Sequence, residues 1–254
     1  MNKNIKRIIL FGIPMDPWTM EYTVNTIHER IKNGVFTQHA AVNVAKLVNM
    51  QTDSVLRESV TSSDIINIDG MGIVWGARFL DLDVPERVAG IDLFVNLLEM
   101  SANENYPVFL LGAEPEVLEQ AVDNLTRKIE NLIIADYHHG YFWEDEEAVV
   151  QKIRRSGAKL IFVAVTSPKK EIFIDKWKAK LGVTFVMGVG GTFDVIAGKV
   201  KRAPNWMQNY GSEWLYRVFQ EPGRMWKRYF MTNSKFLFLL LSEKIRHITT
   251  KTFS

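Results

Sequence analysis

The chain has 254 residues, of which 47% are hydrophobic and 24% are charged, a composition that excludes a largely disordered or low-complexity chain. It has no cysteine, which excludes disulfides, zinc–thiolate centres, iron–sulfur clusters and cysteine nucleophiles. No run of about 18 apolar residues is present, so the sequence predicts no transmembrane segment.

The net charge of +2 is unevenly distributed. Residues 1–198 hold 20 Lys and Arg against 26 Asp and Glu, whereas residues 199–254 hold 11 against 3, so the balances are −6 and +8. The basic segment is rich in Trp and Tyr, and this combination suits an anionic membrane surface or phosphate groups. The alternative is a helical pair that packs its aromatic side chains on the body and leaves its cations in solvent. Nucleic acid is not expected as a partner, because the rest of the chain is acidic and has no nucleic-acid motif.

In chain order, strand patterns alternate with helix patterns. Residues 1–7 are basic, and the apolar run 8–13 leads to Pro14 without a small-residue cleavage site, so we interpret this run as a first strand rather than a signal peptide. Further strands are expected at 38–43, 64–68, 107–111, 132–137, 160–165 and 184–187. Helices are expected at 19–32, 44–60, from 73, 91–102, 115–128, 145–156 and 167–180.

This alternation predicts an α/β fold, a Rossmann-like and mostly parallel sheet with helices on both faces. The alternation stops near residue 200, after which helices dominate. We therefore expect an α/β catalytic body at 1–198 and a basic, aromatic helical appendage at 199–254. Ligands of such sheets bind at the carboxyl ends of the strands, so the polar residues that follow strands are the candidates for a site.

Asp69 follows one strand and precedes Gly70-Met71-Gly72, where glycines let a backbone approach a ligand. The alternative is a carboxylate that caps the next helix. The glycines do not match a dinucleotide fingerprint, because the third one, Gly76, is one place late and the acidic residue precedes them. Binding of NAD is therefore not expected.

Other strand-end and loop motifs are less specific. Asp81-Leu82-Asp83 has the bare Asp-x-Asp pattern of metal-dependent sugar-nucleotide enzymes, but a surface loop explains it better. Arg87 is either a solvated loop residue or a bidentate clamp for phosphate. The turn at 188–194 offers backbone amides to a phosphate or a base, and Asp194 can accept hydrogen bonds from a ribose or uracil, although a tight turn without ligand fits too. Serine-hydrolase, P-loop, zincin and EF-hand motifs are absent.

Taken together, these stretches resemble the WecG/TagA/CpsF glycosyltransferases, glycosyltransferase family 26, over about residues 8–230. The order and number of the matches carry the resemblance, which lies in Asn43–Lys46, Asp69–Val74, Arg87–Asp92, Phe109–Ala113, His139–Phe142, Ser167–Glu171, Gly188–Asp194, Gly198–Pro204 and Glu213–Arg224.

The resemblance implies transfer of a sugar from a UDP-sugar, with an N-acetylmannosamine-type donor favoured, to a sugar on polyprenyl (undecaprenyl) diphosphate. The reaction would invert the anomeric centre and need neither an Asp-x-Asp metal nor a cofactor. It would serve wall teichoic acid, enterobacterial common antigen or exopolysaccharide synthesis, on a cytoplasmic protein bound peripherally to the inner face of the cell membrane. Homo-oligomers are known in the family, so residues 236–241 are expected either to enter the membrane or to line an oligomer interface.

Roles carry over by position. Asp69 matches the proposed general base, and Asn43 and Arg87 match residues near the donor sugar and its phosphates. Asp194, and less directly Tyr141, match positions near the nucleoside. Substrate contacts are also expected at Gly112, Lys170, Gly190 and, for the diphosphate, Arg217, Arg224 and Lys227.

Two positions depart from the family pattern. Ala41 stands where Thr is frequent, and Lys170 stands where Gln is expected, which adds a cation and removes an amide acceptor. A donor that carries a carboxylate, such as a UDP-uronic acid, would favour this cation, and UDP-glucose is a further alternative. A nucleotide-dependent oxidoreductase and a membrane-surface scaffold without activity are the rival functions.

Overall fold

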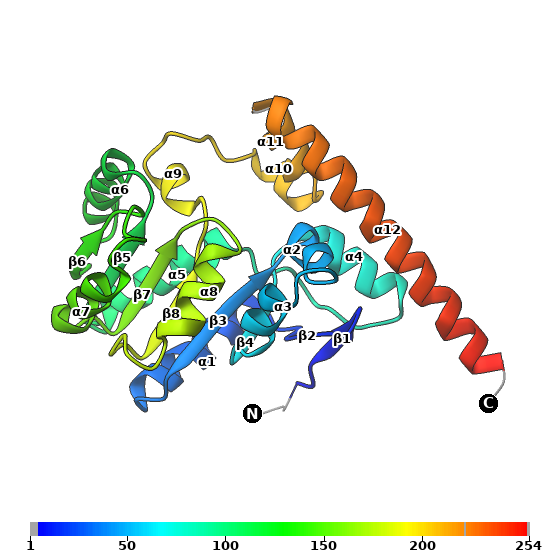
Figure 1. The fold of residues 1–254 in the computed structure, drawn as a ribbon, viewed down its shortest axis with the longest axis horizontal. Helices are drawn as coiled ribbons and strands as arrows, with labels where there is room; N and C mark the ends of the chain where they lie inside the picture. The colour runs from blue at the N-terminus through cyan, green and yellow to red at the C-terminus, as the bar shows by residue number, and fades with distance from the viewer. Residues whose placement is uncertain (1–4, 221, 253–254) are drawn as a thin grey trace.

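The computed structural model describes residues 5–220 and 222–252, and its core is a six-stranded sheet, whose arrangement can be followed in Figure 1. The strand order is β4-β3-β8-β7-β5-β6, and every neighbouring pair is parallel. The predicted α/β class with a parallel sheet is confirmed. The strands are β3 (Thr37–Val42), β4 (Ile65–Ile68), β5 (Val108–Gly112), β6 (Ile134–His138), β7 (Leu160–Ala164) and β8 (Phe185–Gly188).

The central strands are apolar on both sides because helices cover both faces of the sheet. In β7, Leu160 and Phe162 pack in one cluster, while Ile161 and Val163 pack in another. The first face is covered by α1 (Met20–Lys32), α5 (Gly90–Asn103) and α6 (Pro115–Lys128). The other is covered by α7 (Glu146–Ser156) and α8 (Lys169–Trp177), and near β3 and β4 by α2 (Val44–Asn49), α3 (Ser54–Thr61) and α4 (Met71–Phe79).

The expected first strand at 8–13 is wrong. Residues Ile8–Leu10 and Ile13–Met15 form β1 and β2, an antiparallel hairpin outside the parallel sheet. Phe11 and Gly12 between them both have positive φ, at 51° and 73°, which a two-residue hairpin turn requires and a continuous strand does not allow. The expected helix at 44–60 is likewise two helices, because Asp53 caps α3 through a 2.9 Å hydrogen bond from the Leu56 amide.

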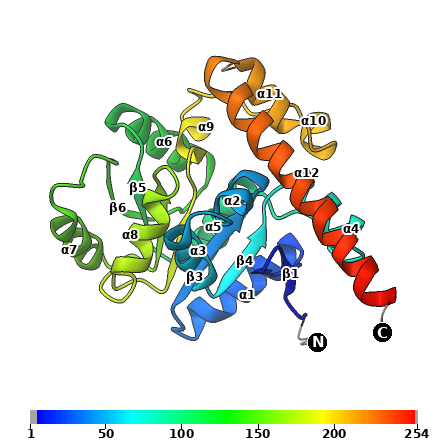
Figure 2. The ribbon, with the colours of Figure 1, turned by 45° about the vertical axis from the view of Figure 1, so that its right-hand side comes forward.

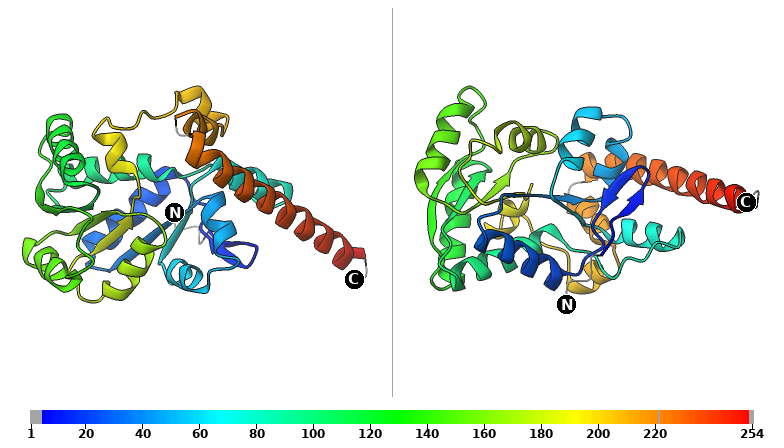
Figure 3. Two further views of the ribbon diagram at one scale, coloured as in Figure 1. Left: turned by 45° about the horizontal axis from the view of Figure 1, so that its top comes forward. Right: turned by 90° about the horizontal axis from the view of Figure 1, so that it is seen from below.

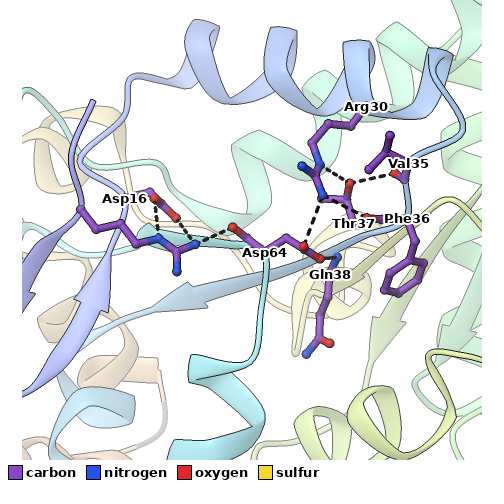
Figure 4. A network of polar contacts seen from close by, with 8 residues as sticks. Asp16, Arg30, Val35, Phe36, Thr37, Gln38 and Asp64 are labelled. Atoms are coloured by element: carbon purple, nitrogen blue, oxygen red, sulfur yellow. Dashed lines mark hydrogen bonds and ion pairs between the residues drawn. The ribbon is translucent and has the colours of Figure 1, made fainter. Parts of the chain in front are cut away.

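A polar network fixes the hairpin and β4 at the amino ends of the strands (Figure 4). The Asp16 carboxylate accepts hydrogen bonds from Arg7 at 2.9 and 3.1 Å and from the Ile66 amide at 2.7 Å. Asp64 accepts from Arg30 at 3.3 Å and from the Gln38 amide at 2.8 Å. These contacts are at the opposite end of the strands from the predicted site, so their role is to keep the hairpin, β3 and β4 in register.

The chain after β8 is helical, as predicted, and consists of α9 (Thr192–Ile196), α10 (Asn205–Asn209), α11 (Glu213–Gln220) and α12 (Pro222–Thr252). The long α12 passes α2 and α4, and its C-terminal end projects away from the sheet (Figures 2 and 3). Phe236 and Leu240 of α12 are buried in the cluster beneath α4. Gly76 of α4 permits this packing, since a Cβ there would lie 2.7 Å from the Phe236 ring.

A second face of α12 is apolar and exposed. Its large exposed side chains recur at helical spacing beside and opposite the buried Phe236 and Leu240, and they are Trp226, Phe230, Met231, Leu237, Phe238, Leu241 and Ile245. In residues 5–220 and 222–252, no helix has the length and apolarity needed to cross a bilayer. This helix therefore has one face in the protein core and a second apolar face in solvent.

Candidate active site

Asp69 lies where β4 ends, before α4 begins. Its amide donates to the Val42 carbonyl at 2.8 Å, which places it beside the end of β3. The cap residue of α4 is Gly70, with no side-chain cap, so the alternative of Asp69 as a helix cap is wrong. Its carboxylate instead accepts a hydrogen bond from the Gly90 amide at the start of α5. The carboxyl group is thus held at the carboxyl edge of the sheet by backbone groups.

The environment of Asp69 favours its protonated form. The pKa of Asp69 is raised from 3.8 to about 6, with burial as the largest cause and the carboxylate of Glu213 acting in the same direction. The Gly90 hydrogen bond, Arg87 and Lys46 act in the opposite direction. A carboxylate with this pKa is ionised at neutral pH and is a stronger base than an ordinary aspartate, as a general base requires.

Arg87 lies in the loop between α4 and α5, and its partner comes from the appendage. Its Nη1 donates to Glu213 Oε2 at 3.3 Å, and the two side chains are 16% and 21% exposed. Glu213 is the first residue of α11. Segments 126 residues apart in sequence thus meet beside Asp69, and the tertiary fold brings the appendage into the site.

A second ion pair fixes the same junction. Arg202 donates from Nη1 and Nη2 to the two carboxylate oxygens of Asp92, at 2.6 and 2.7 Å. These bonds raise the pKa of Arg202, and the carboxylates of Glu213 and Asp69 add to this effect. Arg202 therefore faces three acids, and Asp92 lies in the first turn of α5, next to the amide that binds Asp69.

Lys46, whose charge acts on Asp69, belongs to a buried group of charges. Glu171 contacts Lys46 at 2.9 Å and Lys170 at 2.6 Å, and all three side chains are less than a tenth exposed. Burial alone would raise the pKa of Glu171, but the two ammonium groups outweigh it and lower the pKa to about 2. The stem of Lys170 crosses Gly188, where a Cβ would lie 2.9 Å from it. The lysine that departs from the family pattern thus has a carboxylate partner inside the protein.

This charged group borders a small cavity below the strand ends. The lining includes Gln38, His39, Ala41 and Ser63 together with the three charged residues. Burial lowers the pKa of His39 to about 4, and its ring bonds the Asn67 amide oxygen at 2.9 Å, so it is neutral at pH 7. Two lysines and one glutamate leave one net positive charge here.

The predicted nucleoside residues lie at the other side of the strand ends. Lys199 binds Glu114 at 2.6 Å, and this pairing raises its pKa, with smaller contributions from Asp194 and Tyr141. Tyr141 is 64% exposed. Asp194 and Tyr141 thus share a neighbourhood with a cation that the sequence analysis did not select.

The glycines have different roles. Gly112 has φ of +123°, and a Cβ on it would lie 2.4 Å from the Ala164 carbonyl, so close strand packing explains this glycine without a substrate. Gly190 has φ of +56° and open space around its Cα. Of these two glycines, the geometry leaves Gly190 as the one whose backbone a ligand can approach.

The remaining predicted residues are placed as follows. Asn43 caps α2 through a 3.0 Å hydrogen bond from the Lys46 amide and lies beside Gly70. Lys227 is exposed on α12. Arg217 and Arg224 fall in α11 and α12, but their side chains lie outside those that the structure describes.

Sequence reasoning missed five charged residues that surround Asp69 or support it. They are Lys46, Asp92, Glu171, Arg202 and Glu213. Each lies within a stretch that carried the family resemblance, which was the available signal, but nothing in the sequence says which charges pair. The Asp-x-Asp segment is a surface loop, as expected, and Asp81 pairs with Lys244 of α12.

A comparison with protein-family models matches residues 8–250 to the glycosyl transferase WecG/TagA/CpsF family. The match spans nearly the whole chain, so the protein belongs to this family and is a glycosyltransferase of cell-surface polysaccharide synthesis. Among the described residues, no group of three or more His, Asp or Glu side chains is placed to hold a metal ion.

Proposed function

We propose that the protein transfers a sugar with inversion from a UDP-sugar to a sugar carried on polyprenyl diphosphate, with Asp69 as the general base. The observation that carries this proposal is the partly desolvated carboxyl group of Asp69, at the carboxyl edge of a parallel sheet and next to Arg87. This edge is where ligands of such sheets bind. An N-acetylmannosamine-type donor is the first expectation.

The proposed reaction is a single displacement. Asp69 takes the proton of the acceptor hydroxyl as its oxygen forms a bond to the anomeric carbon. The bond between that carbon and the oxygen of the β-phosphate breaks, and UDP leaves with the electron pair. For a base with a pKa of about 6, the rate depends more on the alignment of the acceptor hydroxyl with the carboxylate than on the strength of the base. The backbone hydrogen bond from Gly90 orients the Asp69 carboxylate for this transfer.

Charge on the leaving diphosphate requires cations nearby. Arg87, in the loop between α4 and α5, is a cation of the body whose charge acts on Asp69. Arg217, Arg224 and Lys227 are proposed to join it from the appendage, with backbone amides at Gly190. We accordingly propose that residues 199–254 act as an appendage that completes the site and that the chemistry needs no Asp-x-Asp metal.

The exposed apolar face of α12 supports binding to a membrane surface. Large apolar side chains on one face of a helix, with lysines nearby such as Lys227 and Lys235, are typical of helices that lie in the interface of anionic bilayers. We propose that α12 holds the protein at the inner face of the cell membrane, where a lipid-linked acceptor is delivered. A homo-oligomer that covers the same face is the alternative occupant.

The ion pair of Lys170 distinguishes two classes of donor. Lys170 favours a donor with a carboxylate only if its ammonium group can leave Glu171, since the two lie 2.6 Å apart. The ion pair therefore favours a neutral N-acetylhexosamine donor over a UDP-uronic acid. UDP-glucose is the control substrate for a neutral sugar without the acetamido group.

The test is release of UDP in the presence of vesicles, a short-chain polyprenyl diphosphate sugar and one of three donors: UDP-N-acetylmannosamine, UDP-N-acetylmannosaminuronate or UDP-glucose. We expect turnover with the first, unchanged by a chelator, and a product of inverted configuration. Release of UDP without transfer to the lipid, or a change in nicotinamide absorbance in a parallel assay, would contradict the proposal.

A further inference from the structure

The two arginines that join the appendage to the body are paired very differently. Arg202 presents two nitrogens to Asp92 at 2.6 and 2.7 Å, in the bidentate arrangement that guanidinium and carboxylate favour. Arg87 makes one longer contact, 3.3 Å, with Glu213. A guanidinium has five N–H donors, and in the part of the chain that the structure describes the Arg87 side chain makes no other hydrogen bond.

The position of the Arg87–Glu213 pair, close to Asp69, indicates a role in substrate binding. Both Arg87 and Glu213 act electrostatically on Asp69, with opposite signs, so this pair lies near the proposed base. Carboxylate and phosphate are alternative anionic partners of a guanidinium. A phosphate next to the Glu213 carboxylate would be repelled by it at close range. Arg87 can therefore serve a phosphate fully only when Glu213 moves away.

We infer that Glu213 occupies, in the substrate-free protein, the place at Arg87 that a phosphate group of the nucleotide takes, and that the nucleotide displaces it. The inference rests on the proposed function, in which Arg87 binds the donor diphosphate. One anion replaces another beside Asp69, so the exchange limits the change in local charge. Glu213 begins α11, so its release breaks one contact between α11 and the body, while Arg202 keeps the preceding segment bound to Asp92.

The test is calorimetric titration of the full-length protein with UDP, which needs no knowledge of the donor sugar. Glu213→Gln removes the competing charge with little change in shape, and Glu213→Ala removes the side chain. We expect both variants to bind UDP about fivefold more tightly than the unchanged protein, a difference of about 1 kcal/mol. The matched control is Glu243→Gln, which removes an appendage carboxylate that pairs with Arg246 in α12, and it should leave the affinity unchanged.

A double-variant comparison shows whether the effect passes through Arg87. In an Arg87→Gln background, Glu213→Gln should no longer tighten UDP binding, since the contested partner is gone. Equal or weaker UDP binding by both Glu213 variants, with unchanged melting temperatures, would overturn this inference while leaving the proposed donor intact. If the unchanged protein bound no UDP, the proposed function itself would fall.

Discussion

Arg202, from the segment after α9, binds both carboxylate oxygens of Asp92 in the first turn of α5, at 2.6 and 2.7 Å. The amide of Gly90, two residues before Asp92, donates to the proposed base, Asp69. One helix terminus thus anchors the appendage and orients the reactive carboxylate. Displacement of the appendage is expected to disturb the base.

Arg202→Lys tests this coupling, because lysine keeps the charge but cannot form two parallel hydrogen bonds. We expect a loss of about 1 kcal/mol in unfolding free energy and at least a severalfold fall in kcat. Unfolding in denaturant and turnover with the active donor are the measurements. Arg127→Lys changes an exposed arginine that pairs within α6 and should alter neither. Equal behaviour of the two variants would mean that the pair is dispensable.

Asp69→Asn should abolish transfer and leave UDP affinity nearly unchanged, because the amide cannot accept the proton. Loss of a general base costs about 10²–10⁴ in rate. Asp83→Asn, at an exposed loop position, is the control. Full activity of Asp69→Asn would remove this residue from the mechanism.

The pH profile of the unchanged protein provides an independent check. The base acts in its ionised form, so with a pKa of about 6 the value of kcat/KM should be flat above pH 7 and fall about tenfold per unit below pH 6. A profile that stays flat down to pH 4.5 would show that this carboxyl group is not the base.

The same group should make stability depend on pH. The folded state holds the Asp69 proton more tightly than the unfolded chain, whose pKa is the ordinary 3.8, so stability contributed by this group falls as pH rises from about 4 to about 6. Asp69→Asn removes the ionisable group and therefore this loss of stability at higher pH. We expect the variant to be more stable than the unchanged protein at pH 7.5, by up to about 3 kcal/mol, and nearly equal at pH 4. A constant difference across this range would contradict the shift.

The buried charges predict unequal effects of two lysine substitutions. Lys46→Met leaves Glu171 with one ammonium partner and also removes the 2.6 Å bond to the Ala41 carbonyl, so we expect a loss of about 3 kcal/mol or more. Lys170→Gln retains Lys46 and an amide donor for Glu171, and should cost less. Denaturant unfolding at pH 7 compares them. A larger loss for Lys170→Gln would show that Lys46 is the minor partner.

Substitution of two phenylalanines of α12 distinguishes the contribution of this helix to stability from its contribution to membrane binding. Phe236 is buried and Phe238 is 71% exposed. Phe236→Ala should lower the unfolding free energy by about 3 kcal/mol, whereas Phe238→Ala should leave it unchanged but weaken sedimentation with phosphatidylglycerol vesicles. Vesicle binding that survives Phe238→Ala and Phe230→Ala together, or a protein that sediments as an oligomer without vesicles, would favour the oligomer interface.

Apolar periodicity in the sequence predicted most of the fold, and the polar residues that follow strands predicted part of the candidate site. Alternating strand and helix patterns predicted the parallel sheet, because a strand buried on both faces, such as 160–164, must be a nearly continuous apolar run. The same reasoning placed Asp69 and Asp194 at the carboxyl edge, since all parallel strands end there. It failed at 8–13, where Phe11 and Gly12 adopt positive φ that apolarity does not reveal.

Only the tertiary structure decided which charges meet. Arg87 and Glu213 are 126 residues apart, and Lys46 and Glu171 belong to helices beside different strands, so no local pattern could pair them. Nor could sequence show that Asp69 is desolvated, because burial depends on how the surrounding elements pack in three dimensions. Local sequence fixes secondary structure through backbone preference and apolar spacing. The pKa and partners of a side chain follow from long-range packing.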